Sequence, residues 1–265
     1  MNTTPATPPR NTEPTPAGVR EELDLTMFVP CYNEEERITG TLETIKAAMA
    51  EVPACTYEVI VVDDGSKDRT CEKVAEFQHA NPGLPVILRK NPRNLGLARG
   101  FVETSFHGRG RYYRLVCGDN VEPKETMVTL LKLMGRADLV LPYYPVLPGK
   151  SVVRRAISKT FTFLVDLLSG YSVNYYNGCA IYRRFHVMRW APYNYGFGFQ
   201  ADLITMLLDE GATHIQVAVS GSHYVKEGGR SPLNFRNFVS TGHTLFEIFL
   251  RRVQRIIYPP RPSPP

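Results

Sequence analysis

Two periods of apolar residues alternate along this chain. Short runs of consecutive apolar residues, many of them β-branched, are typical of buried strands, and apolar residues three and four positions apart are typical of amphipathic helices. The runs predict strands at Leu23–Val29, Tyr57–Val62, Val86–Leu88 and Tyr112–Cys117. The spaced segments predict helices at Ile38–Met49, Thr70–His79 and Leu97–Phe106, and a further helix that ends at Leu133. Strands that alternate with helices predict a parallel α/β sheet with right-handed crossovers.

The strand that ends at Val62 is followed by two acids, Asp63 and Asp64, and then by a glycine and a serine. Ligands of open α/β sheets bind where the carboxyl ends of strands meet loops, so the two carboxylates are candidate ligand contacts. An ordinary polar turn after a strand explains the same residues. The loop after the first strand adds Tyr32 and Asn33, an aromatic ring and an amide that suit a base to be stacked and hydrogen-bonded.

Two further loops follow strands of the same predicted sheet. Arg89–Gly100 contains four cations beside Gly96, a glycine that permits close backbone approach, as a phosphate-facing loop requires. A solvated basic loop is the alternative, and it suits the first two cations better than Arg93 and Arg99. The fourth strand is followed by Gly118–Asn120, which brings another carboxylate to the same edge of the sheet.

The second half of the chain offers arginines and one more acid. Arg154, Arg155 and Ser158 begin an amphipathic helical segment, and arginines there could bind a phosphate bidentately or lie on a solvated helix face. Asp202 stands at the start of a helix predicted to continue through Leu208. A chemical role and a favourable position near the helix dipole both explain an acid at this place.

The order and spacing of four motifs resemble those of the family 2 inverting glycosyltransferases, which have the GT-A nucleotide-diphospho-sugar transferase fold, a Rossmann-like, mostly parallel sheet flanked by helices. The motifs are Pro30–Glu35, Val61–Ser66, Asn94–Gly96 and Gly229–Ser231. The layout is most similar to the dolichol-phosphate mannosyltransferase and polyprenyl-phosphate glycosyltransferase group, over roughly residues 24–240.

The resemblance implies roles for individual residues of this chain. The implied contacts to the nucleotide sugar are Pro30, Tyr32, Asn33, Glu34, Asp63, Asp64, Asn94, Gly96, Gly118 and Asn120. Asp119 and Asp202 are implied to be catalytic, and Asp119 to hold Mg²⁺ or Mn²⁺ against the donor diphosphate. The implied acceptor and phosphate site is Arg154, Arg155, Ser158, Arg230 and Ser231, the last two in a glycine-rich loop that closes over the phosphates.

Two positions depart from the family's pattern. The first acid of the family's Asp-x-Asp motif is Cys117 here, and a thiol is a poor ligand for Mg²⁺ or Mn²⁺. The expected metal site is then weaker, completed by Asn120, Glu122 or water, or it is absent. An Asp that the group carries ahead of Gly178 is Asn174 here, which removes one charge from the acceptor side.

The composition limits the partners and the cellular compartment that are expected for this chain. A net charge of +5 over 265 residues permits phosphates or anionic lipid as partners without demanding nucleic acid. Five cysteines without a Cys-x-x-Cys pair argue against a disulfide framework and a structural zinc site, and favour a reducing compartment. Neither end resembles a signal peptide, and no run of about eighteen apolar residues predicts a membrane span. We expect a cytoplasmic protein, soluble or peripheral on the inner face of the membrane.

Four segments are expected along the chain. Residues 1–22 form a disordered arm rich in Pro and Thr, 23–240 the glycosyltransferase domain, 241–258 a basic amphipathic helix and 259–265 a Pro-rich tail. Apolar residues of the helix gather on one side, and Arg251, Arg252 and Arg255 on another. Such a helix can lie on an anionic membrane or pack on the domain as its last helix.

The sequence therefore predicts a glycosyltransferase that moves a hexose from GDP-mannose or a UDP-hexose to a polyprenyl phosphate with inversion. One alternative acceptor is the hydroxyl of a glycan or small molecule, with Asp202 as the base, because a phosphate acceptor is already anionic and needs none. Another alternative is a nucleotide-sugar-binding module without activity, which Cys117 supports.

Overall fold

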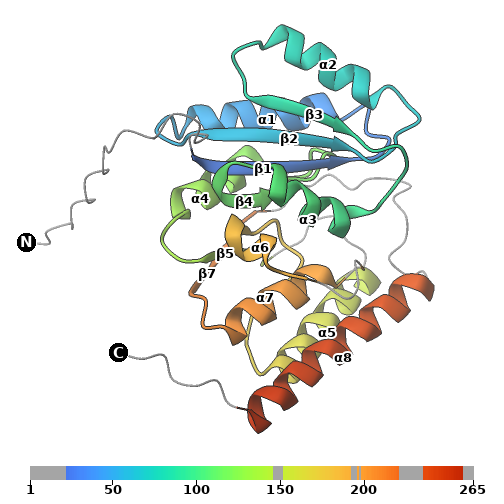
Figure 1. Cartoon of the computed structure of the whole chain (residues 1–265), viewed down its shortest axis with the longest axis vertical. Helices are drawn as coiled ribbons and strands as arrows, with labels where there is room; N and C mark the ends of the chain where they lie inside the picture. Colours follow the sequence, from blue (N-terminus) through green and yellow to red (C-terminus); the bar gives the residue numbers. More distant parts are fainter. Residues whose placement is uncertain (1–21, 146–151, 192–195, 197, 221–234, 259–265) are drawn as a thin grey trace, which may run out of the picture.

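Seven strands form one sheet with helices on both of its faces (Figure 1). The computed structural model describes residues 22–145, 152–191, 196, 198–220 and 235–258. The strands are β1 (Leu23–Cys31), β2 (Tyr57–Asp63), β3 (Val86–Lys90), β4 (Gly110–Leu115), β5 (Leu139–Tyr143), β6 (Ile181–Arg183) and β7 (His214–Ala218). The helices are α1 (Ile38–Ala50), α2 (Thr70–Ala80), α3 (Leu97–His107), α4 (Lys124–Leu133), α5 (Val152–Ser169), α6 (Arg184–Met188), α7 (Phe199–Asp209) and α8 (Phe235–Ile257).

The strand order in the sheet is β3-β2-β1-β4-β6-β5-β7. β1 pairs in parallel with β2 and β4, β2 with β3, and β5 with β7. β6 runs antiparallel to both of its neighbours, β4 and β5. The predicted mostly parallel sheet is confirmed.

The side chains of β1 divide between the two faces of the sheet, because successive residues of a strand point to opposite sides. Leu25, Met27 and Val29 pack in a cluster with apolar residues of α1, α2 and α4. Phe28 packs on the other face, where its ring meets Phe101 of α3 with 6.2 Å between centroids. Both faces of the central strand are therefore buried, as expected for a continuous apolar run in a parallel sheet.

The alignment of the strands brings four loops to one edge of the sheet. Cys31 of β1 is paired with Asp63 of β2, and Asp63 with Lys90 of β3. β4 ends two residues before Cys117, and the backbone continues along β1 through hydrogen bonds from Val116 and Gly118. The predicted convergence of the strand-end loops is confirmed for β1, β2, β3 and β4.

Three elements do not follow from the apolar pattern of the sequence. β5, β7 and α6 are each five residues long, which is too short to show a period of either kind. Their place is fixed by pairing and packing with distant segments, as in the parallel alignment of Leu139 with His214. Secondary structure of this kind depends on tertiary contacts.

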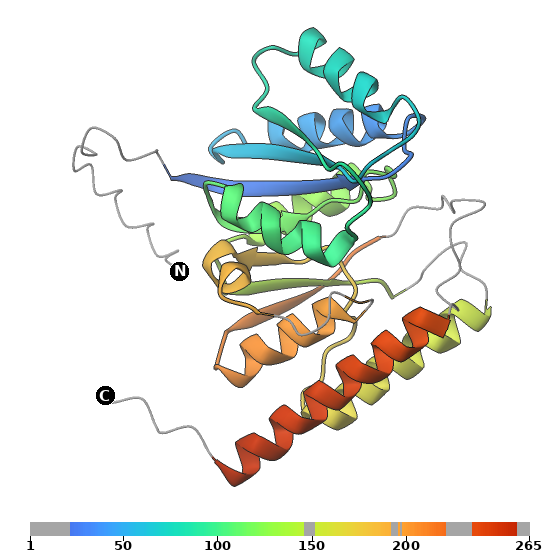
Figure 2. The ribbon, with the colours of Figure 1, turned by 45° about the vertical axis from the view of Figure 1, so that its right-hand side comes forward.

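The helices α5 and α8 lie side by side below the rest of the fold in both views (Figures 1 and 2). α8 begins at Phe235, so the domain boundary expected between residues 240 and 241 falls inside a continuous helix. In the described part of the chain, no helix is both long and apolar enough to cross a membrane.

Candidate functional site

Hydrogen bonds join the loop after β1 to the loop after β2. The amide of Asn33 donates to Ser66 Oγ at 2.9 Å, and the Asn33 side-chain oxygen accepts from the amide of Lys67 at 2.8 Å. Asn33 adopts a positive φ of 55°, a conformation that Asn tolerates better than most residues. The predicted base-binding loop with Tyr32 is thus held by the Asp-Asp-Gly-Ser turn.

Asp63 is fully buried and shapes its own turn. One carboxylate oxygen accepts the amide of Ser66 at 3.1 Å, and the other lies 2.9 Å from the Cys71 thiol on α2. Burial and the Asp63 carboxylate raise the pKa of Cys71 to about 11, so Cys71 stays a thiol that donates to Asp63. The predicted contact of Asp63 with a nucleotide stays a prediction, and the structure adds a role in loop geometry.

Asp64 connects the β2 loop to the loop between β3 and α3. Its carboxylate accepts from the Asn91 side chain at 2.8 Å and from the amides of Leu95 and Gly96 at 2.8 and 2.9 Å. Gly96 has a φ of +94°, and a Cβ added there would meet no atom within 4 Å. The backbone of Gly96 therefore borders open space, as expected of a residue that a ligand approaches.

The cations of the β3–α3 loop do not all point to a ligand. Arg99 forms an exposed ion pair with Glu103 one turn later in α3, at 2.6 Å. Arg89, Lys90 and Arg93 are exposed near the sheet edge. The phosphate-facing role predicted for Arg93 and Arg99 stays a prediction, and Glu103 competes with a phosphate for Arg99.

The loop that carries Asp119 is packed against β1 and α1. A Cβ on Gly118 would lie 2.7 Å from the carbonyl oxygen of Pro30, so no side chain fits at this position. Asn120 has a positive φ of 54°, donates its amide to Thr41 Oγ1 at 3.0 Å and accepts from Thr44 at 3.1 Å. Asp119 is half-buried between these two fixed residues, beside the β1 loop.

Three of the side chains considered as partners of Asp119 at a metal are already engaged. Cys117 Sγ lies 4.0 Å from Cys179 Sγ, and this neighbour together with burial holds the pKa of Cys117 well above its usual range. Glu122 pairs with the fully buried Arg114 at 2.6 Å. Asn120 uses its oxygen on Thr44. In the described part of the chain, no group of three His, Cys, Asp or Glu side chains could hold a metal ion.

These residues still fit a magnesium or manganese ion that arrives with a diphosphate. Mg²⁺ is commonly held by one or two carboxylates together with substrate phosphates and water. Asp119 supplies one carboxylate beside the β1 loop, in a segment that packs against Pro30. The second protein ligand that the family's motif provides is missing, because Cys117 remains a protonated thiol.

The predicted acceptor residues lie on two segments. Arg154 and Arg155 are exposed in the first turn of α5, and Ser158, one turn later, hydrogen-bonds the Tyr175 hydroxyl, whose pKa burial raises to about 12. Asn174 donates to Gln216, which ties it to β7. The predicted residues Arg230 and Ser231 lie outside the described residues.

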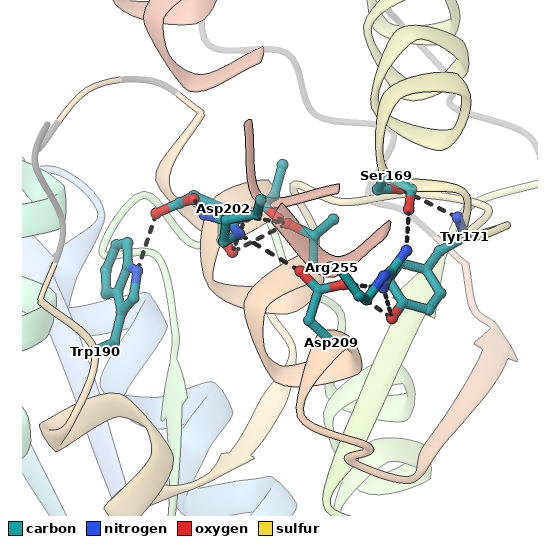
Figure 3. A network of polar contacts seen from close by, with 9 residues as sticks. Ser169, Tyr171, Trp190, Asp202, Asp209 and Arg255 are labelled. Atoms are coloured by element: carbon teal, nitrogen blue, oxygen red, sulfur yellow. Dashed lines mark hydrogen bonds and ion pairs between the residues drawn. The ribbon is translucent and has the colours of Figure 1, made fainter. Parts of the chain in front are cut away.

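Asp202 is the centre of a polar network between α7 and α8 (Figure 3). Its Oδ2 accepts from the Trp190 indole at 3.0 Å, and its Oδ1 pairs with Arg251 of α8. Both carboxylate oxygens are engaged in this state, which favours an orienting role over that of a general base. Trp190 and Arg251 are site neighbours that the sequence analysis did not identify, because only the tertiary fold brings them to Asp202.

Arg252 and Arg255 of α8 also turn toward the domain. Arg255 contacts Asp209 and the Tyr171 hydroxyl and donates to the carbonyl of Ser169 at 2.9 Å (Figure 3). Arg252 donates to the carbonyl of Leu167 in α5 at 2.5 Å. These arginines attach α8 to α5 and α7, as expected for a last helix that packs on the domain, and contact of the helix with an anionic membrane stays a prediction.

A cavity of about 580 Å³ lies between α7 and α8. Its lining includes Trp190, Asp202, His243, Glu247 and Arg251. None of the predicted donor-binding residues lines it, so the two predicted catalytic acids belong to different surroundings. Asp119 lies beside the β1 loop, and Asp202 of α7 faces α8.

Comparison with known proteins gives a family match over most of the fold. The model of the family described as Glycosyl transferase family 2 matches residues 26–190. A dolichyl-phosphate beta-glucosyltransferase of Trichomonas vaginalis is 35% identical over 102 residues, 37% of this chain and 30% of that protein. A dodecaprenyl-phosphate galacturonate synthase of Rhizobium johnstonii is 28% identical over 163 residues, 61% of this chain and 47% of that protein. The matched region thus spans 30% and 47% of the length of these two curated relatives.

Solved structures confirm the predicted GT-A fold. A mannosyltransferase of Pyrobaculum calidifontis in complex with GDP-Man and Mn²⁺ superposes with a TM-score of 0.63 at 17% identity, over 90% of this chain and 71% of that chain. Glucosyl-3-phosphoglycerate synthase of Mycobacterium tuberculosis, in complex with Mn²⁺, UDP and phosphoglyceric acid, gives 0.60 at 17% identity, over 87% and 80%. At this level of identity the likeness shows the fold alone.

Proposed function

Because the chain belongs to glycosyl transferase family 2, we propose that it transfers a hexose from a nucleotide-diphospho-sugar, GDP-mannose or a UDP-hexose, to a polyprenyl phosphate with inversion. The observation that carries the proposal is the convergence of the β1, β2, β3 and β4 loops at one edge of the sheet, where Asp64 holds Gly96 beside open space. The names of the relatives, which act on dolichyl and dodecaprenyl phosphates, support this class of acceptor.

In this proposal the strand-end loops bind the donor. Tyr32 stacks on the base, and the backbone around Asn33 and Asp63 fixes its edge. Gly96 lets the backbone approach the diphosphate, and Arg93 supplies positive charge nearby. The hydrogen bonds of Asp64 keep these parts in place before the donor arrives, which lowers the cost of binding.

We propose that Asp119 holds Mg²⁺ or Mn²⁺ together with the donor diphosphate. The ion, when bound, neutralises the charge that develops on the leaving diphosphate. The Mn²⁺ bound in structural neighbours supports this assignment. With a single carboxylate and a thiol at Cys117, the free protein should bind the ion weakly, and the donor should strengthen that binding.

On the acceptor side, Arg154 and Arg155 would bind the phosphate of the lipid. A phosphate oxygen is anionic at neutral pH, so it attacks the anomeric carbon without a base, and Asp202 orients the site through Trp190 and Arg251. Peripheral contact with an anionic membrane, on the cytoplasmic side, follows from a lipid-linked acceptor. A hydroxyl acceptor would instead require Asp202 to leave Arg251 and act as the base.

A thermal-shift panel of GDP- and UDP-sugars, with and without Mn²⁺, tests donor binding. We expect one base class to raise the melting temperature, and Mn²⁺ to enlarge that rise only when the nucleotide sugar is present. Absence of any shift with every nucleotide sugar would contradict the donor site.

Transfer to a short-chain polyprenyl phosphate tests the reaction itself. Asp119→Ala should lower the transfer rate by about 100-fold or more, because the leaving diphosphate loses its metal. Glu125→Ala, at an exposed acid in the first turn of α4, is the control and should retain the rate. Unchanged transfer by Asp119→Ala would exclude the metal assignment, and donor binding without any transfer by the unaltered protein would favour a module without activity.

A further inference from the structure

Exposed apolar side chains are concentrated on α5 and α8. Seventeen large hydrophobic side chains are exposed in the described part of the chain, and twelve of them lie on these two helices, five on α5 and seven on α8. Those of α5 are Val152, Val153, Ile157, Phe163 and Leu167. Those of α8 are Phe238, Val239, Phe246, Phe249, Leu250, Ile256 and Ile257.

The seven exposed residues of α8 include three pairs of neighbours, and the pairs and Phe246 are separated by about one or two helical turns, which places all seven along one side of the helix. The inward side of the same helix is largely polar, with the buried Thr244, the arginines at 251 and 255, and Ile248 in the core. A surface helix of a globular protein normally has the opposite arrangement. α8 therefore presents its apolar side to solvent, because Arg251 and Arg255 on its other side contact Asp202 and Asp209 of α7.

The helix is held firmly in this orientation. Arg251 contacts Asp202, Asp209 and Thr205 on α7, the last at 2.7 Å. The Cα of Gly198 approaches α8 so closely that a Cβ there would lie 2.7 Å from Thr244. Rotation of α8 to bury its apolar side would break these contacts, so the outward face is a fixed surface.

We propose that the outward faces of α5 and α8 form one membrane-docking surface, and that it binds a bilayer chiefly by inserting apolar side chains below the headgroups. This inference rests on the proposed function, since a polyprenyl phosphate is held in a bilayer. It assigns the contact to two helices, α5 and α8, and chiefly to apolar insertion. The sequence suggested only that the last helix, as a basic amphipathic helix, can lie on an anionic membrane. The side-by-side packing of the two helices is seen in Figure 2.

The charges around this surface favour a bilayer over a second copy of the chain. Arg154, Arg155 and Lys159 are exposed on α5. The only acid of α5, Asp166, accepts from the Tyr176 hydroxyl at 2.7 Å, and Glu247, the only acid of α8, lies 3.7 Å from His243. A dimer through this face would bring cations together, whereas anionic headgroups would pair with them.

The surface also connects to the predicted site. The arginines that orient α8 include Arg251, the partner of Asp202 in the first turn of α7. Docking of α8 on a bilayer would therefore set the height of Asp202 above the lipid headgroups. The acceptor phosphate of a polyprenyl lipid lies at that same headgroup level.

Flotation with lipid vesicles tests the proposal on the full chain. Phe246→Glu and Phe249→Glu each place a charge on the exposed apolar side of α8 and should weaken binding to anionic phosphatidylglycerol vesicles by roughly tenfold or more. Phe106→Glu is the matched control, because Phe106 of α3 is 56% exposed, like Phe246. It should bind vesicles like the unaltered protein. Binding should persist at high salt, since apolar insertion is not screened.

Two outcomes would overturn the inference. The first is absence of vesicle binding, or equal loss in all three variants. The second is a dimer of the unaltered protein in analytical ultracentrifugation that Phe246→Glu dissociates, together with no binding to vesicles. The exposed apolar surface would then be the interface with a second copy of the chain. A nucleotide-sugar thermal shift, measured on the same samples, separates the claims. Donor binding without vesicle binding refutes only the docking surface, and vesicle binding without donor binding or transfer refutes only the proposed function.

Discussion

The loops at the strand ends and the helical pair α5–α8 both depend on buried or half-buried charges, but with different results. At the strand ends, Asp63 accepts a hydrogen bond from its own turn, Asp64 accepts hydrogen bonds from the loop after β3, and the backbone of Gly96 borders open space. On α8, Arg251 and Arg255 reach inward to α7, and apolar side chains are left outward. In one region the charges connect polar loops at the edge of the sheet, and in the other they leave an apolar surface exposed.

This difference shows that the direction in which a charged side chain points, more than its presence in the sequence, decides whether it forms a polar surface or binds another part of the fold. A sequence pattern of arginines on one side of a helix indicates a polar surface only when no acid on another element competes for them. Here Asp202 and Asp209 of α7 do compete, and the ion pairs are only partly exposed. The same reasoning applies to Asp64, which a motif marks as a ligand contact and the fold uses as a connection between loops.

Asp64→Ala tests the strand-end half of the comparison and should have the largest effect on stability. Removal of the carboxylate leaves the amides of Leu95 and Gly96 and the side chain of Asn91 without their acceptor, which should cost about 2–4 kcal/mol in the free energy of unfolding. The freed Gly96 loop should also weaken donor binding. Urea unfolding and a nucleotide thermal shift measure the two effects.

The control for Asp64→Ala is Glu103→Ala, which removes an exposed acid of α3 whose only described ion pair is with Arg99. It should change neither unfolding nor nucleotide binding appreciably. If the two variants unfold alike, Asp64 does not connect the loops, and the contrast with α8 disappears.

Arg251→Ala tests the helical half and should have an intermediate effect. It leaves the partly buried Asp202 without its cation and Thr205 without a donor, which should cost about 1–3 kcal/mol. Proteolysis should then cut the α8 region faster than the sheet. Lys159→Ala, an exposed cation of α5, is the control. Unfolding and proteolysis that match the control would mean that the arginines do not fix α8.

Asp138→Asn should have the smallest effect, visible only in acid. Hydrogen bonds from the Thr213 hydroxyl and amide, together with Arg183, lower the pKa of Asp138 below its ordinary value. A lowered pKa contributes stability above the unfolded value and loses it as the pH falls through the folded value. The difference in free energy of unfolding between the two proteins should therefore be largest, about 1 kcal/mol, near neutral pH and should shrink as the pH falls below the ordinary Asp pKa of about 3.9 and through the lower folded value.

A pH-independent difference for Asp138→Asn would mean that the carboxylate charge is not what joins β5 to β7. Asp138 lies in the second half of the sheet, where it accepts hydrogen bonds from Thr213 and so connects two segments as Asp64 does. The experiment therefore shows whether such a connection depends on the charge of the acid.

The sequence by itself determined the alternating elements of the first half, the fold class and the loops that converge at the sheet edge. Each rests on local periods and on residues close in the chain, such as the run before Asp63 and the glycine at 96. Tertiary structure alone decided the short strands β5 and β7, the engagement of Glu122 by Arg114, and the direction of α8. That direction depends on ion pairs between residues about fifty positions apart, such as Arg251 with Asp202, and an amphipathic pattern does not state which of its two sides faces the protein.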